Sequence, residues 1–252
     1  MNAQRVRAVV RREMRDFRRN RFVIGTMAIL PFVFLITPMI TVFKVPESTS
    51  GPQAKAAIGV ISLLMLIVPL VIPPVIAAYS VVGERDQGTL EPVLTAPVRG
   101  SELLLGKALA AFIPSVGVAY AIYLVVAISI RFGAAHIVRS VFFHPPELIA
   151  QILFTPLLAL WSIWACIAIS TRASDVRVAQ QLGSLAGLPL LAFTSLISFQ
   201  LVKPSVPLAI GLALALVAID FGGWLVCSRL FDPERLIVGP QARQTSNLQV
   251  VR

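Results

Sequence analysis

The sequence predicts an all-α polytopic membrane protein, with six transmembrane helices preceded by an amphipathic helix at the membrane interface. Of its 252 residues, 57% are hydrophobic and 13% are charged, whereas soluble domains carry about 25% charged residues. The mean hydropathy is +0.83. The apolar residues gather in runs of about 20, the length that an α-helix needs to cross a hydrocarbon layer roughly 30 Å thick. A backbone in lipid must satisfy its own hydrogen bonds, and the alternation of a membrane barrel does not occur in the sequence, so we expect helices.

Six apolar runs define the predicted spans, and we divide the chain around them. The runs lie at about 22–43, 56–82, 103–130, 148–169, 182–202 and 206–230. The first run is longer than the 7–15 apolar residues of a cleaved signal peptide, so we expect it to remain as a span. The chain then consists of an N-terminal helix (1–21), a transmembrane domain (22–230) with a loop at 83–102, and a C-terminal tail (231–252).

The distribution of Lys and Arg predicts the orientation. Most of the 22 Lys and Arg residues fall in segments on the same side as the N-terminus. The exceptions are Lys44, Lys55, Arg131, Arg139 and Lys203. Cytoplasmic loops carry the excess of Lys and Arg, so we expect both termini and the 83–102 loop to face the cytoplasm, in a plasma membrane. The net charge of +10 is expected to meet anionic lipid headgroups rather than nucleic acid.

The N-terminal segment predicts an amphipathic helix before the first span. Its apolar residues recur at helical spacing and arginines fill the other faces. The apolar residues are Val6, Val9, Val10, Met14 and Phe17. Such a helix is expected to lie in the interface, with its apolar face in the acyl boundary and its arginines on phosphates. The arginines assigned to this interface are Arg11, Arg12, Arg15, Arg18 and Arg19. The alternative is a solvated basic stretch that only fixes the topology.

The 83–102 loop predicts a short, capped helix between the second and third spans. Thr89 can cap a helix that begins at Leu90, because its hydroxyl can accept from an unpaired backbone N–H. Pro97 would end this helix, and Ser101 can cap the third span. Such a part is suited to insertion into a groove on a soluble partner. A merely well-ordered turn is the alternative.

The run ERDQGTLEPVLTAPVRGSELLLGK resembles the loop between spans two and three in the membrane subunits of ABC exporters of the type-2 export family. In that family a block like E-R-x-x-G-T-L-E is followed by a proline and a late G-K. The matching residues here are Glu84, Arg85, Gly88, Thr89, Leu90, Glu91, Pro97, Gly106 and Lys107. Further matches are the basic N-terminal helix and the segments 170–191 and 229–236.

The resemblance implies a permease half that works with a second half, identical or homologous, and with two copies of a cytosolic ABC ATPase. The N-terminal helix would be the connecting helix, and the 83–102 loop would be the coupling helix that seats on the ATPase. The residues assigned to this coupling are Glu84, Arg85, Gly88, Thr89, Leu90, Glu91 and Pro97. The phosphate-binding pattern G-x-x-x-x-G-K-[ST] does not occur in the sequence. We therefore expect no enzymatic activity and no cofactor in this chain, with ATP and Mg²⁺ bound by the partner.

Two other polar groups invite a functional interpretation. Asp220 lies inside the last apolar run, where a charge costs about 2.5–3.5 kcal/mol on insertion scales, so it is expected to face a cavity, a partner or another helix. Asp220 could contact a cationic substrate or hold a proton, and Trp224 would then line the same substrate path. The alternative is that Asp220 is a packing residue. Arg172, Asp175 and Arg177 form a second polar patch on the predicted cytoplasmic side, either a lesser contact with the ATPase or a solvated turn.

Among function classes, the permease of an ATP-driven exporter is the leading hypothesis. An ion-coupled secondary transporter that uses Asp220 is the alternative, although such proteins normally carry several ionisable residues within the membrane. A membrane-embedded enzyme ranks last, because no paired carboxylates or nucleophile–base pair stand at a span end. His136 and His144 have no Cys or acidic cluster at ligand spacing, so we expect no metal site.

Overall fold

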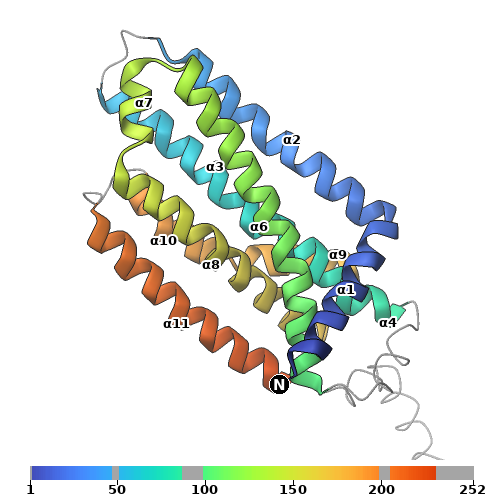
Figure 1. Ribbon diagram of the computed structural model, residues 1–252. Coiled ribbons are helices and arrows are strands. Elements are labelled where there is room, and N and C mark those ends of the chain that lie inside the picture. The colour runs from blue at the N-terminus through green and yellow to red at the C-terminus, as the bar shows by residue number, and fades with distance from the viewer. Residues whose placement is uncertain (1, 47–50, 87–98, 199–204, 231–252) are drawn as a thin grey trace, which may run out of the picture.

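A computed structural model describes residues 2–46, 51–86, 99–198 and 205–230. Within these ranges every regular element is a helix, and the long helices form one elongated bundle (Figure 1). The elements are α1 (Ala3–Arg19), α2 (Arg21–Lys44), α3 (Gly51–Ala78), the π-helical turn η1 (Tyr79–Gly83), α4 (Glu84–Asp86), α6 (Gly100–Gly133), α7 (His136–Phe142), α8 (Pro145–Ser170), α9 (Val176–Leu185), α10 (Leu188–Ser198) and α11 (Val206–Leu230).

Five of the helical stretches in the described ranges are long and apolar enough to cross a membrane. They are Val23–Lys44, Gly51–Gly83, Gly100–Gly133, Pro145–Ser170 and Val206–Leu230. They correspond to the first, second, third, fourth and sixth predicted spans. The prediction of an all-α polytopic membrane fold is confirmed.

Helix α3 is the centre of the bundle. It packs against α2, α6, α8, α9 and α10, whereas α11 packs mainly against α8, and α2 and α11 lie at opposite edges in Figure 1. The buried apolar side chains form three clusters along its length. One cluster joins α1, η1 and the beginning of α6; we call this the α1 end of the bundle. Another surrounds α7 at the opposite end.

The predicted fifth span, 182–202, is not one continuous helix. It falls on the second half of α9, a break after Leu185, and α10, and its last residues lie outside the described ranges. A Cβ atom added to Gly187 would lie 2.4 Å from Leu70 Cδ2, so this position has no room for a side chain. The Trp161 indole donates to the Ala186 carbonyl at 2.9 Å, and thereby satisfies one of the carbonyls that a helix end leaves unpaired.

Two helices that bear on function, α6 and α2, begin at the α1 end of the bundle. Helix α6 begins at Gly100 with Arg99 as its N-cap, so the prediction that Ser101 caps this span is wrong. The carboxylate of Glu102 takes the capping role instead, because it accepts from the Arg99 backbone N–H at 3.3 Å. Helices α1 and α2 are separated by Asn20, whose side-chain oxygen accepts from the Val23 backbone N–H at 3.2 Å.

The opposite end of the bundle carries α7 and the beginning of α8. Helix α8 begins with Pro145 and Pro146, and Glu147 stands in its first turn. Proline loses nothing at these positions because the first N–H groups of a helix have no intrahelical partner.

Candidate functional site

A buried lysine joins three elements at the α1 end of the bundle. The Lys107 side chain of α6 is 0% exposed, and its Nζ lies 2.6 Å from Glu13 Oε1 of α1. The same Nζ lies 2.7 Å from Glu84 Oε2 of α4. It also donates to the Ser80 carbonyl of η1 at 2.6 Å. We call Lys107, Glu13, Glu84 and Ser80 the Lys107 cluster.

The geometry of this cluster explains why a charged lysine can be buried. An ammonium group has three N–H donors and no acceptor, and Lys107 finds three acceptors. A buried charge is strongly unfavourable unless it is paired and hydrogen-bonded. Fully satisfied polar networks in a low-dielectric interior are rigid and favour a single arrangement. The Lys107 cluster therefore fixes α1, η1 and α4 relative to α6.

The two carboxylates of the cluster differ in their surroundings. The Glu13 side chain is 2% exposed. Burial raises the pKa of Glu13 above its ordinary value, and the Lys107 ammonium acts in the opposite direction. Glu84 lies beside Arg12, whose Nη2 is 3.8 Å from Glu84 Oε1. The Arg12 Nε is also 3.7 Å from Asp16 Oδ2, so Arg12 extends the charge network from the Lys107 cluster towards the surface.

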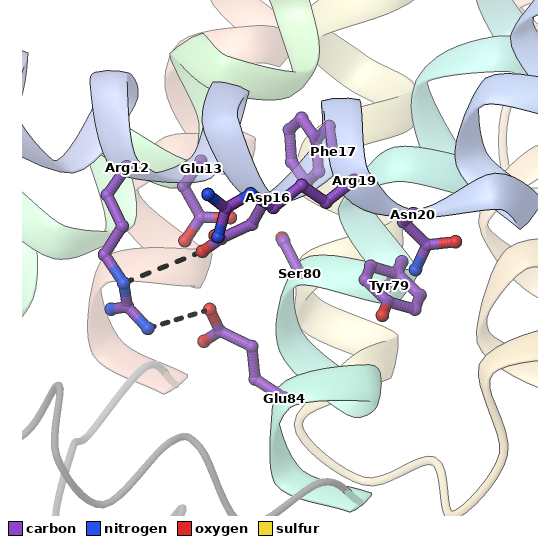
Figure 2. A pocket seen from close by; sticks show the side chains of 9 residues that line it. All are labelled: Arg12, Glu13, Asp16, Phe17, Arg19, Asn20, Tyr79, Ser80 and Glu84. Atoms are coloured by element: carbon purple, nitrogen blue, oxygen red, sulfur yellow. Dashed lines mark ion pairs between the residues drawn. The ribbon is translucent and has the colours of Figure 1, made fainter.

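A cavity of about 470 Å³ opens beside these groups, between α1 and the end of the second span (Figure 2). Arg12, Asp16 and Arg19 of α1 line it on one side, and Tyr79 and Glu84 line it on the other. In Figure 2 the Arg12 side chain reaches across this space to Glu84. The cluster is thus sealed towards the bundle and borders open space on the side of Arg12.

A glycine next to Lys107 allows α1 to approach α6 closely. A Cβ atom added to Gly106 would lie 2.5 Å from Val9 Cγ1 and 2.7 Å from Val9 Cβ. Real Cβ atoms do not approach other atoms so closely, because the interior of a protein is already close-packed. Gly106 and Lys107 therefore act together: the glycine provides the contact surface for α1, and the lysine provides its ionic attachment.

The apolar stripe of α1 has a different environment from the predicted one. We expected it to lie in the acyl boundary of the membrane. In the structure Val6 and Phe17 are buried, and Val9, Val10 and Met14 pack against the cluster of side chains at the α1 end. The stripe is used for contacts with the protein itself, because α1 lies along the beginning of α6.

The arginines assigned to the membrane interface, Arg11, Arg12, Arg15, Arg18 and Arg19, lie on the exposed side of α1. Their interaction with lipid phosphates stays a prediction.

A second polar contact joins the beginning of α1 to the first turn of α6. The Asn2 backbone N–H donates to Glu102 Oε1 at 2.7 Å. The Arg5 Nη1 lies 3.6 Å from Glu102 Oε2. We call Glu102, Asn2 and Arg5 the Glu102 contact. Helix α1 thus touches both ends of the 83–102 loop: Glu84 where the loop begins, and Glu102 where it ends.

The predicted coupling residues are only partly described. Gly88, Thr89, Leu90, Glu91 and Pro97 lie outside the described residues. Glu84 belongs to the Lys107 cluster, and the Arg85 Nη2 donates to the Ala173 carbonyl in the connection between α8 and α9.

The contact between Arg85 and Ala173 places the second predicted polar patch, Arg172, Asp175 and Arg177, beside the beginning of the 83–102 loop. Arg172, Asp175 and Arg177 are largely exposed around the same connection. The Asp175 carboxylate accepts from the Arg177 backbone N–H at 2.6 Å and caps α9. Capping gives Asp175 a structural role and leaves both arginines available at the surface.

The predicted substrate-path residues lie on α11, away from the Lys107 cluster. Asp220 is buried, and within the described ranges neither of its carboxylate oxygens has a hydrogen-bond partner. Trp224 packs edge-on against Trp164 with ring centroids 5.3 Å apart. An apolar groove of about 340 Å³ lies between α8 and α11 beside these rings, but Asp220 does not line it. In the described ranges no group of three His, Cys, Asp or Glu residues could hold a metal ion.

Sequence reasoning missed half of the Lys107 cluster. Lys107 entered only as part of the G-K pair, and Glu13 and Ser80 were not selected. Glu102, which belongs to the Glu102 contact, was not selected either. One signal was present: Glu13 falls on the same helical face as Val6 and Phe17, and an acid on an apolar face implies a buried partner.

The described helices define a multi-pass membrane protein whose α1 end carries a buried ionic cluster. The family model described as ABC-2 type transporter matches residues 4–205, which is most of the chain. The chain therefore belongs to the ABC-2 type transporter family and is a membrane permease of an ABC transporter, as the resemblance of its loop predicts. No curated protein matches the chain.

Proposed function

We propose that this permease exports its substrate across the plasma membrane, driven by a separate cytosolic ATPase that docks on the 83–102 loop. Membership of the ABC-2 type transporter family supports this proposal, and so does the excess of Lys and Arg on the N-terminal side, which favours a cytoplasmic α1 end. The observation that carries it is the loop's attachment. The loop joins two helical stretches that are long and apolar enough to cross a membrane, Gly51–Gly83 and Gly100–Gly133. The Lys107 cluster holds one end of the loop, and the Glu102 contact holds the other.

In this mechanism, two copies of the ATPase bind ATP and Mg²⁺ and close together. This closure moves the loop. A loop with firmly held ends passes displacement to the helices that it joins, instead of absorbing it by local bending. Arg172 and Arg177 would make a lesser contact with the same ATPase, because the Arg85 bond to Ala173 holds the α8–α9 connection beside the loop. A second permease half, identical or homologous, would complete the transporter.

The experiment starts with purification of the chain from its native membrane. The proposal predicts that a soluble nucleotide-binding protein co-purifies with it. Replacement Glu91→Arg should weaken this association, because Glu91 belongs to the predicted coupling helix. Arg131→Glu is the matched control: it also reverses a charge, but at an exposed residue at the opposite end of the bundle, and it should leave the association unchanged. Purification without any nucleotide-binding protein would contradict the proposal.

The alternative function, an ion-coupled secondary transporter, is favoured by the buried carboxyl group of Asp220, which has no hydrogen-bond partner among the described residues. In that case uptake of protons into vesicles that contain the chain alone should follow an imposed pH gradient and should be lost in Asp220→Asn. Proton movement that is the same in Asp220→Asn as in the original chain would exclude this role for Asp220.

A further inference from the structure

The apolar groove between α8 and α11 takes no part in the proposed coupling. Its walls come from residues 161–168 of α8 and 219–227 of α11, and its volume is about 340 Å³. We call it the α8–α11 groove. Helix α11 lies at one edge of the bundle (Figure 1), and its apolar side chains Phe221 and Leu225 are exposed. The groove therefore opens towards the surrounding membrane.

The length of the groove matches one leaflet of a bilayer. Its wall on α11 runs from Ile219 to Cys227, which is about 12 Å at about 1.5 Å per residue. One leaflet of a hydrocarbon layer roughly 30 Å thick is about 15 Å deep. A single acyl chain that lies along the two helices would therefore occupy the groove over most of the leaflet's depth.

Two polar groups on the walls of the groove are already used within the protein. The Trp161 indole N–H donates to the Ala186 carbonyl at 2.9 Å. The Cys227 thiol donates to the Trp164 carbonyl at 3.0 Å. A polar ligand would lose its hydrogen bonds to water in such surroundings, whereas a hydrocarbon chain loses none. The α8–α11 groove thus suits an apolar occupant.

Two adjacent glycines of α11 give the groove its shape. A Cβ atom added to Gly223 would lie 3.2 Å from the Trp164 Cβ, so this glycine lets α11 approach α8 closely. A Cβ atom added to Gly222 would meet nothing within 4 Å, although Gly222 lines the groove. The wall atoms beside Gly222 therefore gain their packing contacts from an occupant of the groove.

A positive charge stands at one end of the groove. Arg229 follows Val226 by three residues and Gly222 by seven, so it lies on the same face of α11, one turn beyond the groove. It is exposed, and no ion pair among the described residues involves it. Cys227 belongs to the buried cluster at the α1 end. The Arg229 guanidinium is therefore at headgroup level on that side of the membrane, since long basic side chains near a helix end extend to the interface.

We propose that the α8–α11 groove binds an acyl chain of an anionic phospholipid from the leaflet at the α1 end, and that Arg229 binds the phosphate of its headgroup. Charge complementarity selects this occupant. The cytoplasmic leaflet carries the anionic lipids, and a guanidinium group binds phosphate through two parallel hydrogen bonds. A second copy of the chain, related by a twofold axis along the membrane normal, would bring its own Arg229 to the same end of this face, where the like charges repel. The inference depends neither on the ATPase nor on the direction of transport.

The tryptophans of the chain provide a direct test. All three lie at the groove: Trp161 and Trp164 line it, and Trp224 packs against Trp164 with ring centroids 5.3 Å apart. The full chain is reconstituted in phosphatidylcholine vesicles that contain a small fraction of either phosphatidylglycerol or phosphatidylcholine with brominated acyl chains, which quench tryptophan fluorescence on contact. Half-maximal quenching should need about fivefold less of the anionic brominated lipid, the effect of one basic residue at an anionic surface.

Variants at the two ends of the proposed site separate its parts. Arg229→Gln should remove the preference for the anionic lipid, whereas Arg131→Gln, at an exposed arginine of the opposite end, should keep it. Gly222→Leu fills the groove and should weaken quenching by both lipids. Gly211→Leu is its matched control, because an added Cβ there also meets nothing within 4 Å and Gly211 does not line the groove. It should leave the quenching unchanged.

Three results would overturn the proposal. They are equal quenching by the two brominated lipids in the original chain, a preference that survives in Arg229→Gln, and quenching that Gly222→Leu does not change. A second copy seated on the groove would exclude both lipids and give a disulfide-linked dimer in Gly222→Cys, which would also overturn it. If Gly222→Leu does not fold, Arg229→Gln still decides, because it changes an exposed residue. The vesicles contain no ATPase, so a failure of the proposed function leaves this result unaffected.

Discussion

Replacement of Lys107 by Met should destabilise the fold by several kcal/mol, although the two side chains have similar volumes. The change removes an ammonium group that lies 2.6 Å from Glu13 and 2.7 Å from Glu84. The removal of one partner from a buried ion pair costs about 3–5 kcal/mol, because the other charge stays buried. Two features of the cluster place the expected loss of stability near the lower limit of this range, at about 3 kcal/mol. Arg12 remains beside Glu84 at 3.8 Å, and Glu13, whose pKa burial already raises, can take up a proton.

The assay is thermal unfolding in detergent micelles. The double variant Lys107→Met with Glu13→Leu tests whether the loss arises from the charge that remains buried without its partner. Apolar replacement of both members of a buried pair is often neutral or stabilising, so the double variant should recover much of the loss. For a chain of this size about 1 kcal/mol corresponds to a shift of roughly 2–4 °C, so Lys107→Met should unfold roughly 6–12 °C below the original chain for a loss of about 3 kcal/mol. The exposed control Lys55→Met should change stability by less than about 0.5 kcal/mol.

Two results would refute this reasoning. One is a loss below about 1 kcal/mol in Lys107→Met, the value of a surface pair. The other is a double variant whose loss equals the sum of the single losses, because groups in contact should show an interaction energy of about 0.5–3 kcal/mol.

Three further predictions concern single positions. Gly106→Leu should destabilise by about 1–3 kcal/mol through overpacking; the measurement is thermal unfolding, and Val9→Ala in the same chain should recover part of the loss if the clash is with α1. Asp220→Leu should stabilise the chain by about 1–3 kcal/mol, because it removes a buried carboxyl group that has no partner among the described residues; a lower unfolding temperature would show that Asp220 has a partner. Because burial raises the pKa of Glu13, the folded chain keeps this proton to a higher pH than the unfolded chain does. The contribution of Glu13 to stability should be greatest below its ordinary pKa of 4.5 and decline as the pH rises through the raised value. Glu13→Gln should remove this decline, and an equal decline in the variant would contradict the assignment.

The sequence predicts the membrane helices well because their signal is long and does not depend on tertiary contacts. A run of about 20 apolar residues is sufficient evidence for a span. The start of α8 was also predictable, since Pro145 and Pro146 favour the first turn of a helix. The break between α9 and α10 was not, because the run stays apolar across it. Its cause is the approach of Gly187 to Leu70, a residue far away in the sequence.

The Lys107 cluster shows a second limit of sequence reasoning. Lys107 is 94 residues from Glu13 and 23 from Glu84, so no local spacing indicates that the three meet. The apolar stripe of α1 was recognised correctly, but its environment was not. Lipid and protein interior are both apolar, and the period of a helix does not distinguish them. Only the acid at Glu13, on the same face, indicates that this stripe meets a protein partner.

The most direct test of the account is a photo-activated cross-linking residue at Glu91, used in the native membrane. The account predicts a cross-link to a soluble nucleotide-binding protein, and predicts none from the same residue at Arg131. Cross-linking from Arg131 instead, or from neither position, would contradict the claim that a separate ATPase drives this permease through the 83–102 loop.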